Sequence, residues 1–521
     1  MTFENNNELK LQKMKSLYNE FDQMIKRGES SQVFNLCKSI NSSEIPRNLL
    51  VEFAEIARRI GQPQLMIRWL RPIVRSEKPA HPPVSIMELT TYTQGLIRLG
   101  GFNEAQRMIE TILKHEGEKT FEQFRGGIYF MQASLFVMQW KYKKAIPFFK
   151  KHRTLKSVEG YQKVVSTLNL IAAYSAIGDF KKSIFEINRL EPKLIKNNAT
   201  GQFTLILGNL NEVKSQVMFL LKNYSEALLC LDKANQLLKR ADKRSLLYVA
   251  KWKTLIELAV SDSDNKIIYL NQLREIQLQS KLISDYETVR EIDFQYALFT
   301  KNIDMFLKVY WGSRQETYRK RILKIFTDEL NLNPKEFIQK SFNYPLFKQE
   351  EISRIVTKNF PTVDLLSNVR SKLVRKLFAL LTREFYRPLR LIELFDELYP
   401  DEYFNPKSTP EKIHKLINYA RIFITKNKYP IEIKNLKVGF QIVATQPCYL
   451  VIQNSNVDSN NKKLEFKLSP ELQTKREFTI DEFINYHSMP ERTARNTLKK
   501  LIESKKIKKL NFRKKSTFKF L

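Results

Sequence analysis

The end of the chain carries arginine, asparagine and lysine side chains of the kind that contact nucleic acid. Residues 488–521 read SMPERTARNTLKKLIESKKIKKLNFRKKSTFKFL, and no acid occurs from Lys505 onward. Arginine pairs with guanine and asparagine with adenine at base edges, whereas lysines neutralise phosphates and set affinity. The candidates for nucleic-acid contact are Arg492, Arg495 and Asn496, which suit base edges, with Lys499 on the same expected helix and Lys514 and Lys515 in the basic run after it.

These side chains need a helix and a β-hairpin to position them. Ser488 followed by Glu491 is a capping-box pattern, and Pro490 lies near the expected helix start. The helix should bury one apolar stripe, and the hairpin should keep apolar residues on one face. The expected apolar positions are Ala494, Leu498, Leu501 and Ile502 in the helix and Ile507, Leu510, Phe512, Phe518 and Phe520 in the hairpin. A short amphipathic helix from Thr479 precedes them, which gives the order helix, turn, helix, hairpin.

A similar order of elements is expected over residues 368–443. Pro388 and Pro400 end two short apolar helices, and Ser408 or Thr409 can cap a third helix. A strand-like run, PIEIKNLKVGFQIVA, follows that helix. In the third helix the residues that recur at helical spacing and should face the core are Ile413, Leu416, Ile417, Ala420 and Ile424. The further candidates for nucleic-acid contact are Lys412, Lys415, Asn418 and Tyr419 on its outward side, together with Arg421.

Three ordered phrases in this segment match a known family of domains. They are LFDELYP from Leu394 to Pro400, Ala420-Arg421, and Val438-Gly439-Phe440. The segment resembles the DNA-binding domain of OmpR/PhoB-type response regulators and of related antibiotic-pathway regulators. Tyr399 stands where tryptophan is usual, Phe440 stands where tyrosine is usual, and no receiver domain precedes the segment. The later phrase TARNTLKKL is similar to the recognition helix of many bacterial winged-helix repressors. These resemblances imply two winged helix-turn-helix domains that bind duplex DNA.

A different pattern recurs between residues 45 and 240. An aromatic residue is followed by a small residue three positions on and by an apolar residue four further on. The copies start at Phe102, Tyr142, Phe180 and Tyr224, which are 38 to 44 residues apart, and each follows an apolar helical stretch. The pattern resembles the tetratricopeptide repeat. That resemblance implies stacked helix hairpins whose concave surface binds a protein or peptide, here of unknown identity. A further hairpin is expected around Gly61.

The composition favours some classes of partner and argues against others. The chain has 521 residues and a formal net charge of +33, which suits polyanionic partners, although a lysine-rich proteome would give the same charge. Its 3 cysteines are widely spaced and its 5 histidines lack metal-ligand spacing, so no disulfide framework, metal or cofactor is expected. No nucleotide-binding or nucleophile motif occurs, so we expect no enzyme. No signal sequence or membrane-spanning run occurs either, so we expect a cytoplasmic protein without membrane contact.

The sequence predicts a mostly α-helical protein, in which a tetratricopeptide-like α-solenoid is followed by two small α+β winged-helix domains. The expected domains are an N-terminal helical cap (1–44), the helical repeats (45–240), a helical extension of the solenoid (241–365), a first winged helix (366–445), a linker with short strands (446–475) and a second winged helix (476–521).

The preferred hypothesis is a DNA-binding transcriptional regulator whose helical repeats bind or sense a protein or peptide. Two alternatives stay open. One is a scaffold subunit of a protein assembly in which helical repeats end in a winged helix, and the other is an RNA-binding protein that uses the same basic face. The sequence does not say which winged helix reads bases.

Overall fold

The computed structural model describes residues 2–520 with several gaps in between. The gaps are 77–82, 199–200, 240–242, 263–264, 335–336, 338–342, 347–360, 367–368, 437, 452–476, 488–490, 492–493, 495–497, 499–500, 503–506 and 513–514. The chain divides into two units, Met1–Ile452 and Gln453–Leu521.

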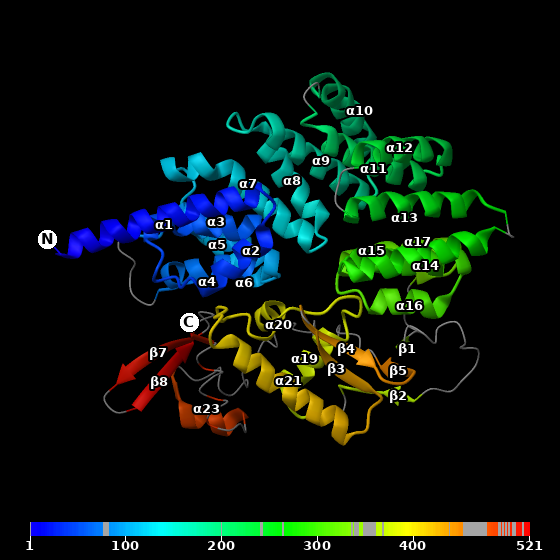
Figure 1. Ribbon diagram of the computed structural model, residues 1–521. Helices are drawn as coiled ribbons and strands as arrows, with labels where there is room; N and C mark the ends of the chain where they lie inside the picture. The colour runs from blue at the N-terminus through cyan, green and yellow to red at the C-terminus, as the bar shows by residue number, and fades with distance from the viewer. Residues whose placement is uncertain are drawn as a thin grey trace. The chain divides into compact units, whose positions relative to one another are not determined.

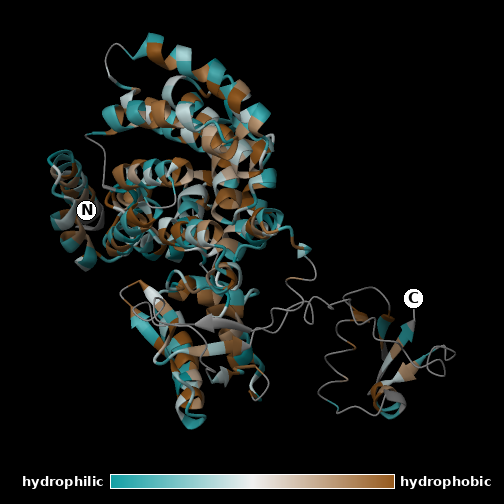
Figure 2. Cartoon of the chain, turned by 90° about the vertical axis from the view of Figure 1, so that its right-hand side faces the viewer, coloured by the Kyte–Doolittle hydropathy of each residue, from teal (hydrophilic) through white to brown (hydrophobic). Residues whose placement is uncertain are grey.

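The first unit begins with a long series of helices joined mostly by short turns (Figure 1). Most of these helices carry both hydrophobic and hydrophilic residues along their length (Figure 2). In chain order they are α1 (Thr2–Lys26), α2 (Ser30–Ser39), η1 (Arg47–Leu49), α3 (Leu50–Arg59), α4 (Pro63–Val74), α5 (Ile86–Leu99), α6 (Phe102–Leu113), α7 (Lys119–Met138), α8 (Tyr142–Thr154), α9 (Gly160–Ala176), α10 (Phe180–Asn197), α11 (Thr204–Leu220), α12 (Tyr224–Leu238), α13 (Lys243–Val260), α14 (Lys266–Leu282), α15 (Tyr286–Thr300), α16 (Ile303–Trp311) and α17 (Glu316–Glu329).

The repeated aromatic marks the first residue of a helix in every copy, because α6, α8, α10 and α12 begin at Phe102, Tyr142, Phe180 and Tyr224. The small residues that follow are fully buried: Ala105, Ala145, Ser183 and Ala227 each have 0% exposure. The apolar residues four positions later, Ile109, Phe149, Ile187 and Leu231, are buried as well. The predicted hairpins are therefore confirmed, and the small residues lie where neighbouring helices approach closely.

One turn geometry joins the helices of these hairpins. The residue two before the second helix has a positive φ at Gly100, Trp140, Gly178 and Lys222. The next amide donates to the carbonyl five residues back, as in Lys141 N to Phe136 O at 2.8 Å. This is the Schellman arrangement that ends a helix with a left-handed residue. The same bond and the same backbone conformation recur at Gly28, Gly61, Ser284 and Lys301, so the series also covers hairpins without the aromatic phrase, including the one expected around Gly61.

The helical extension ends earlier than expected among the described residues. We expected helices up to residue 365, but β1 (Asn343–Leu346) and β2 (Thr362–Val363) lie in that stretch. Both strands flank β5 (Cys448–Val451) in a three-stranded sheet, with β1 antiparallel and β2 parallel to β5. Pro345 cannot donate a helical hydrogen bond, which argues against a helix at β1. The expectation for this stretch was therefore wrong, whereas the central strand, β5, lies in the region expected to be a linker with short strands.

A small α+β part follows the repeats within the first unit. It comprises α19 (Lys372–Leu381), α20 (Leu391–Leu398), α21 (Thr409–Lys426), β3 (Ile431–Leu436) and β4 (Gly439–Ala444). The two strands form an antiparallel hairpin, and Leu389 bridges to Phe440 on the outer side of β4. The order is thus helix, bridge residue, helix, helix, hairpin, and the bridge residue pairs with the last strand.

The described residues of the second unit repeat the later part of this order, from the bridging strand to the hairpin. It contains β6 (Phe478–Thr479), α23 (Ile480–His487), β7 (Ile507–Phe512) and β8 (Lys515–Phe520), and its strand order is β6-β8-β7. The described residues between α23 and β7 that are helical include Ala494, Leu498 and Leu501, and all three are buried with Phe483 and Phe518. The expected fold class, mostly helical with an α-solenoid followed by small α+β parts, is confirmed.

Candidate nucleic-acid interface

Helix α21 buries the face that its sequence predicts. Ser408 is its N-cap residue and Pro410 lies in its first turn, where the missing amide costs nothing. The residues that pack into the core are Ile413, Leu416, Ile417, Ala420 and Ile424, as expected. This packing fixes the rotation of α21 and leaves its opposite face to solvent.

The solvent-facing stripe of α21 contains three of the predicted contact residues. Lys415 and Asn418 are exposed, and Tyr419 has 64% exposure. Ile422, which the sequence reading did not select, is also 64% exposed. Its spacing of four from Asn418 could have identified it, but apolar residues are normally assigned to the core. Lys415 pairs with Glu411 one turn earlier, with Nζ 2.7 Å from Oε1, and both side chains are exposed. Such exposed pairs are weak and open readily.

Two other predicted contact residues are engaged within the protein. Lys412 Nζ lies 2.7 Å from Glu402 Oε1 and 3.7 Å from the centre of the Tyr399 ring. Arg421 donates from Nε and Nη2 to the carbonyl oxygen of Ile433, at 3.0 and 2.7 Å. Arg421 therefore ties α21 to strand β3. This role was not apparent from the sequence, because it depends on how the hairpin folds back on the helix.

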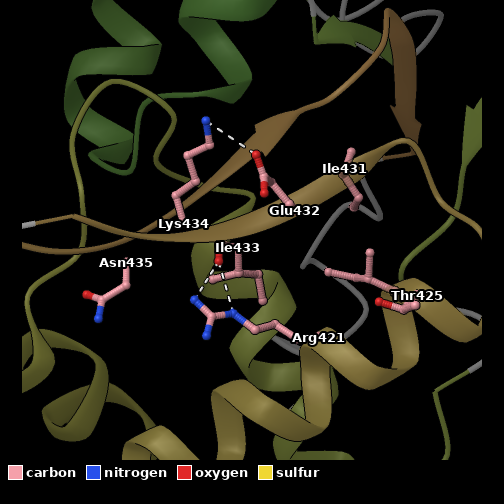
Figure 3. Close-up of a pocket in the computed structure, with 8 residues that line it drawn as sticks. Arg421, Thr425, Ile431, Glu432, Ile433, Lys434 and Asn435 are labelled. Atoms are coloured by element: carbon pink, nitrogen blue, oxygen red, sulfur yellow. Dashed lines mark hydrogen bonds and ion pairs between the residues drawn. The ribbon is translucent and has the colours of Figure 1, made fainter.

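A pocket of about 460 Å³ lies between α21 and β3. Its lining residues are Arg421, Ile424, Thr425, Ile431, Glu432, Ile433, Lys434 and Asn435. Figure 3 shows the Arg421 guanidinium on one side of β3 and the Lys434 and Glu432 side chains on the other. Lys434 Nζ lies 3.3 Å from Glu432 Oε1. The hairpin thus presents a lysine on its outer side while its inner side is anchored by arginine.

The candidates of the second unit lie mostly outside the described residues. These are Arg492, Arg495, Asn496, Lys499 and Lys514, and the Ser488 capping box lies there too. Lys515 is the first residue of β8 and pairs in register with Phe512 of β7. The expected lysine-rich hairpin is present. Thr479 and Glu482 form a capping box at the start of α23, with Thr479 N 2.8 Å from Glu482 Oε2.

Helix α20 is held from two sides by the helical repeats, which the sequence reading missed. Asp396 accepts hydrogen bonds from the backbone amides of Asn103 at 2.7 Å and Glu104 at 2.9 Å. It thereby caps the N-terminus of α6, whose own N-cap residue, Gly101, has no side chain. Figure 1 shows α20 between the repeats and α21.

Burial raises the pKa of Asp396 to about 6, although the two amide hydrogen bonds lower it in part. The neighbouring carboxylates Glu397 and Glu104 also raise the pKa of Asp396. The cost of removing this carboxylate from water therefore exceeds what the two hydrogen bonds return.

The segment after α20 is bound to the same repeats. Two guanidinium groups lie close to the ring of Tyr403, with that of Arg75 3.6 Å and that of Arg107 5.0 Å from the ring centre. Phe404 donates its amide to Glu104 at 2.9 Å and accepts from Arg71 at 2.9 Å. These contacts join residues about 300 positions apart in the chain and fix the loop that leads into α21.

The other side of this part packs against the last repeats. Arg290 on α15 and Glu384 form an ion pair of 2.6 Å with exposures of only 1% and 0%. Tyr386 donates to Asp293 at 2.7 Å. Ile392 of α20 packs into the core of the first repeats, whereas Phe395 belongs to the core shared with α15–α17. Helix α20 therefore lies between two hydrophobic cores.

Other kinds of site find no support in the described part of the chain. No group of histidine, cysteine, aspartate and glutamate side chains there is arranged to hold a metal ion. Cys37, Cys230 and Cys448 are buried and unpaired. Among the described helices, none combines the length and apolar composition that crossing a bilayer requires.

The repeated hairpins and their shared turn make the first part of the chain an α-solenoid of tetratricopeptide-like helix pairs. No model of a protein family matches the chain, and no curated protein matches it in sequence. Among solved structures, a Rap protein in complex with competence and sporulation factor is similar at 10% sequence identity and a TM-score of 0.42. The similarity covers 64% of this chain and 93% of that chain.

Proposed function

We propose that this protein is a DNA-binding regulator in which α19–α21 with β3 and β4, and the second unit, act as two winged helices. The observation that carries the proposal is the shared order of elements. In each unit a helix pair is followed by a hairpin, and a strand or bridge residue before the pair joins the last strand. That order is typical of winged helix-turn-helix domains, whose second helix enters the major groove.

The charges of the exposed surface fit this function. Lys415 and Lys426 lie on the solvent face of α21, and Lys434 lies on the outer side of the hairpin. The hairpin of the second unit carries a dense run of lysines. Cations on a helix and on an adjacent hairpin can neutralise phosphates on both sides of one groove. Two such modules in one chain would raise the effective concentration of the second once the first has bound.

The helical repeats would bind a protein or peptide partner. Stacked hairpins of this kind form extended surfaces that bind other chains. The contacts between α20 and the repeats would let such a partner influence the DNA-binding part.

The test is DNA binding by the full chain as a function of salt. Fluorescence anisotropy with a labelled mixed-sequence duplex should give a slope of log K against log salt near about −5, as about six phosphate contacts predict. Replacing Lys415 and Lys426 together by glutamate should weaken binding strongly. Replacing Lys181 and Lys193, two exposed lysines of α10, makes the same change in net charge and serves as the control. A flat salt dependence, or equal loss in both double variants, would contradict the proposal.

A scaffold role is the second candidate, and one observation favours it. Tyr419 and Ile422 expose apolar surface on α21, as a helix at a protein interface would. Recovery of the full chain in a stoichiometric complex, with no affinity for duplex DNA, would support the scaffold. Stronger competition by structured RNA than by duplex DNA would instead indicate the RNA-binding alternative.

A further inference from the structure

The exposed stripe of α21 has an amide and two apolar side chains at its centre. At 3.6 residues per turn, Glu411, Lys415, Asn418, Tyr419, Ile422 and Lys426 lie within about 100° of one another around the helix. Along the helix axis, Asn418, Tyr419 and Ile422 occupy the middle of this stripe. They are the side chains that a groove-bound α21 would bring closest to base edges.

The side chains that would read guanine are held elsewhere. Guanine is read chiefly by arginine or lysine that reaches O6 and N7. Arg421 directs two of its nitrogens to the carbonyl oxygen of Ile433. Lys412 forms an ion pair with Glu402. Lys415 is the remaining cation near the centre; its exposed pair with Glu411 opens readily, and the proposed function assigns it to a phosphate. The arginine of this helix is thus not available for guanine.

The distribution of charge also selects the centre of α21 as the reading segment. Near its N-terminus the acids Asp401, Glu402 and Glu411 are offset by Lys407, Lys412 and Lys415, so this end carries no excess of positive charge. Beyond Ile422 the exposed charges are positive, at Lys426 and Lys428. The C-terminal half of α21 would therefore face a phosphate backbone, and residues 418–422 would face the bases.

We propose that α21 reads A·T base pairs, with the Asn418 amide on the N6 and N7 edge of adenine and with Tyr419 and Ile422 against thymine methyl groups. This inference rests on the proposed function and names the class of DNA it prefers. An asparagine amide offers one donor and one acceptor, which matches adenine in the major groove, and only thymine presents a methyl group there.

The first experiment compares two duplexes, one of A·T pairs alone and one of G·C pairs alone, with the full chain. We expect the A·T duplex to bind at least about tenfold more tightly. Asn418→Ala should lower affinity for the A·T duplex at least about fivefold and leave the G·C duplex unaffected. Asn188→Ala and Ile195→Ala, at exposed positions of α10, are matched controls that should change neither affinity.

The second experiment removes single groups from the DNA. Deoxyuridine in place of thymidine deletes the methyl group, and 7-deazaadenine deletes the N7 acceptor. The loss of the methyl group should weaken wild-type binding about fourfold per contact and should have no effect on the double variant Tyr419→Ala/Ile422→Ala. The loss of N7 should likewise affect the wild type and not Asn418→Ala. This pairing of protein and DNA changes separates direct contact from an effect of duplex shape.

Each other outcome refutes a stated part of the reasoning. Equal binding to both duplexes, a preference for G·C pairs, or additive effects in the paired changes would overturn the A·T assignment while DNA binding stands. Binding to neither duplex at any salt concentration would overturn the proposed function and this inference together. If Tyr419→Ala and Ile422→Ala leave DNA affinity intact, the apolar stripe does not contact DNA and the assignment is wrong.

Discussion

The capping of α6 by Asp396 makes a quantitative prediction about stability and pH. Asp396→Asn keeps the shape of the side chain, but the amide has one acceptor oxygen for the two backbone amides of Asn103 and Glu104. The amide left without a good acceptor should cost about 1–2 kcal/mol of unfolding free energy. This loss does not depend on pH.

A second contribution depends on pH and has the opposite sign. Asp396 is 5% exposed, and its pKa rises from an ordinary value of 3.8 to about 6 on folding. Between these values the folded chain binds more protons than the unfolded chain, so the stability of the wild type falls as pH rises. Linkage gives a loss of about 1 kcal/mol between pH 5 and pH 7. Asp396→Asn escapes this loss, so its disadvantage should shrink by about 1 kcal/mol over that interval.

Urea unfolding of both chains at pH 5, 6 and 7 measures this difference. Asp401→Asn, an exposed carboxylate of the neighbouring loop, is the control and should change stability by less than about 0.5 kcal/mol at each pH. A difference between wild type and Asp396→Asn that stays constant with pH, or grows toward pH 7, would refute the assignment of a desolvated carboxylate at the α6 N-terminus.

Three further substitutions test other features. Lys222→Gly should raise the free energy of unfolding by about 0.5–1 kcal/mol in urea titrations, because Lys222 holds a left-handed conformation that glycine adopts without strain. A destabilised variant would contradict this interpretation of the turn. Glu384→Ala should lower the free energy of unfolding by about 3 kcal/mol, since it removes a buried partner of Arg290. A loss below about 1 kcal/mol in the same assay would show that the ion pair does not stabilise the fold. Arg421→Ala should speed hydrogen exchange of the amides of β3 by releasing the carbonyl of Ile433, and unchanged exchange there would mean that the helix does not hold the hairpin.

The repeats could be predicted because their determinants are local. An aromatic followed by a small residue sets the start of one helix and its closest approach to the previous helix, and both lie within a short stretch of sequence. The turn was harder to predict from the sequence. Trp140 and Lys222 occupy left-handed positions, where a glycine would have indicated the end of a helix. The buried stripe of α21 was likewise predictable from helical spacing alone.

The docking of α20 could not be predicted for the opposite reason. The sequence of α20 predicts an amphipathic helix with one buried face. In the structure, Ile392 and Phe395 of this helix are both buried, and they belong to two different hydrophobic cores. Nothing near Asp396 in the sequence indicates the backbone amides of Asn103 and Glu104 that it binds. Arg421 was predicted to contact nucleic acid, but it donates hydrogen bonds to the carbonyl oxygen of Ile433 in β3. That contact depends on how the hairpin folds onto α21, which the sequence alone does not show.

The cap on α6 has a consequence for how the chain reaches its native state. Asp396 is 293 residues from Asn103. At about 5–20 residues per second, α6 would leave the ribosome roughly 15–60 s before its cap is made. During that interval the α6 N-terminus and the surfaces that receive Ile392 and Tyr403 are without their partners. The first repeats are therefore expected to finish folding late, when α20 closes a contact that spans more than half of the chain, and they are the part of the solenoid most exposed to misassembly before synthesis ends.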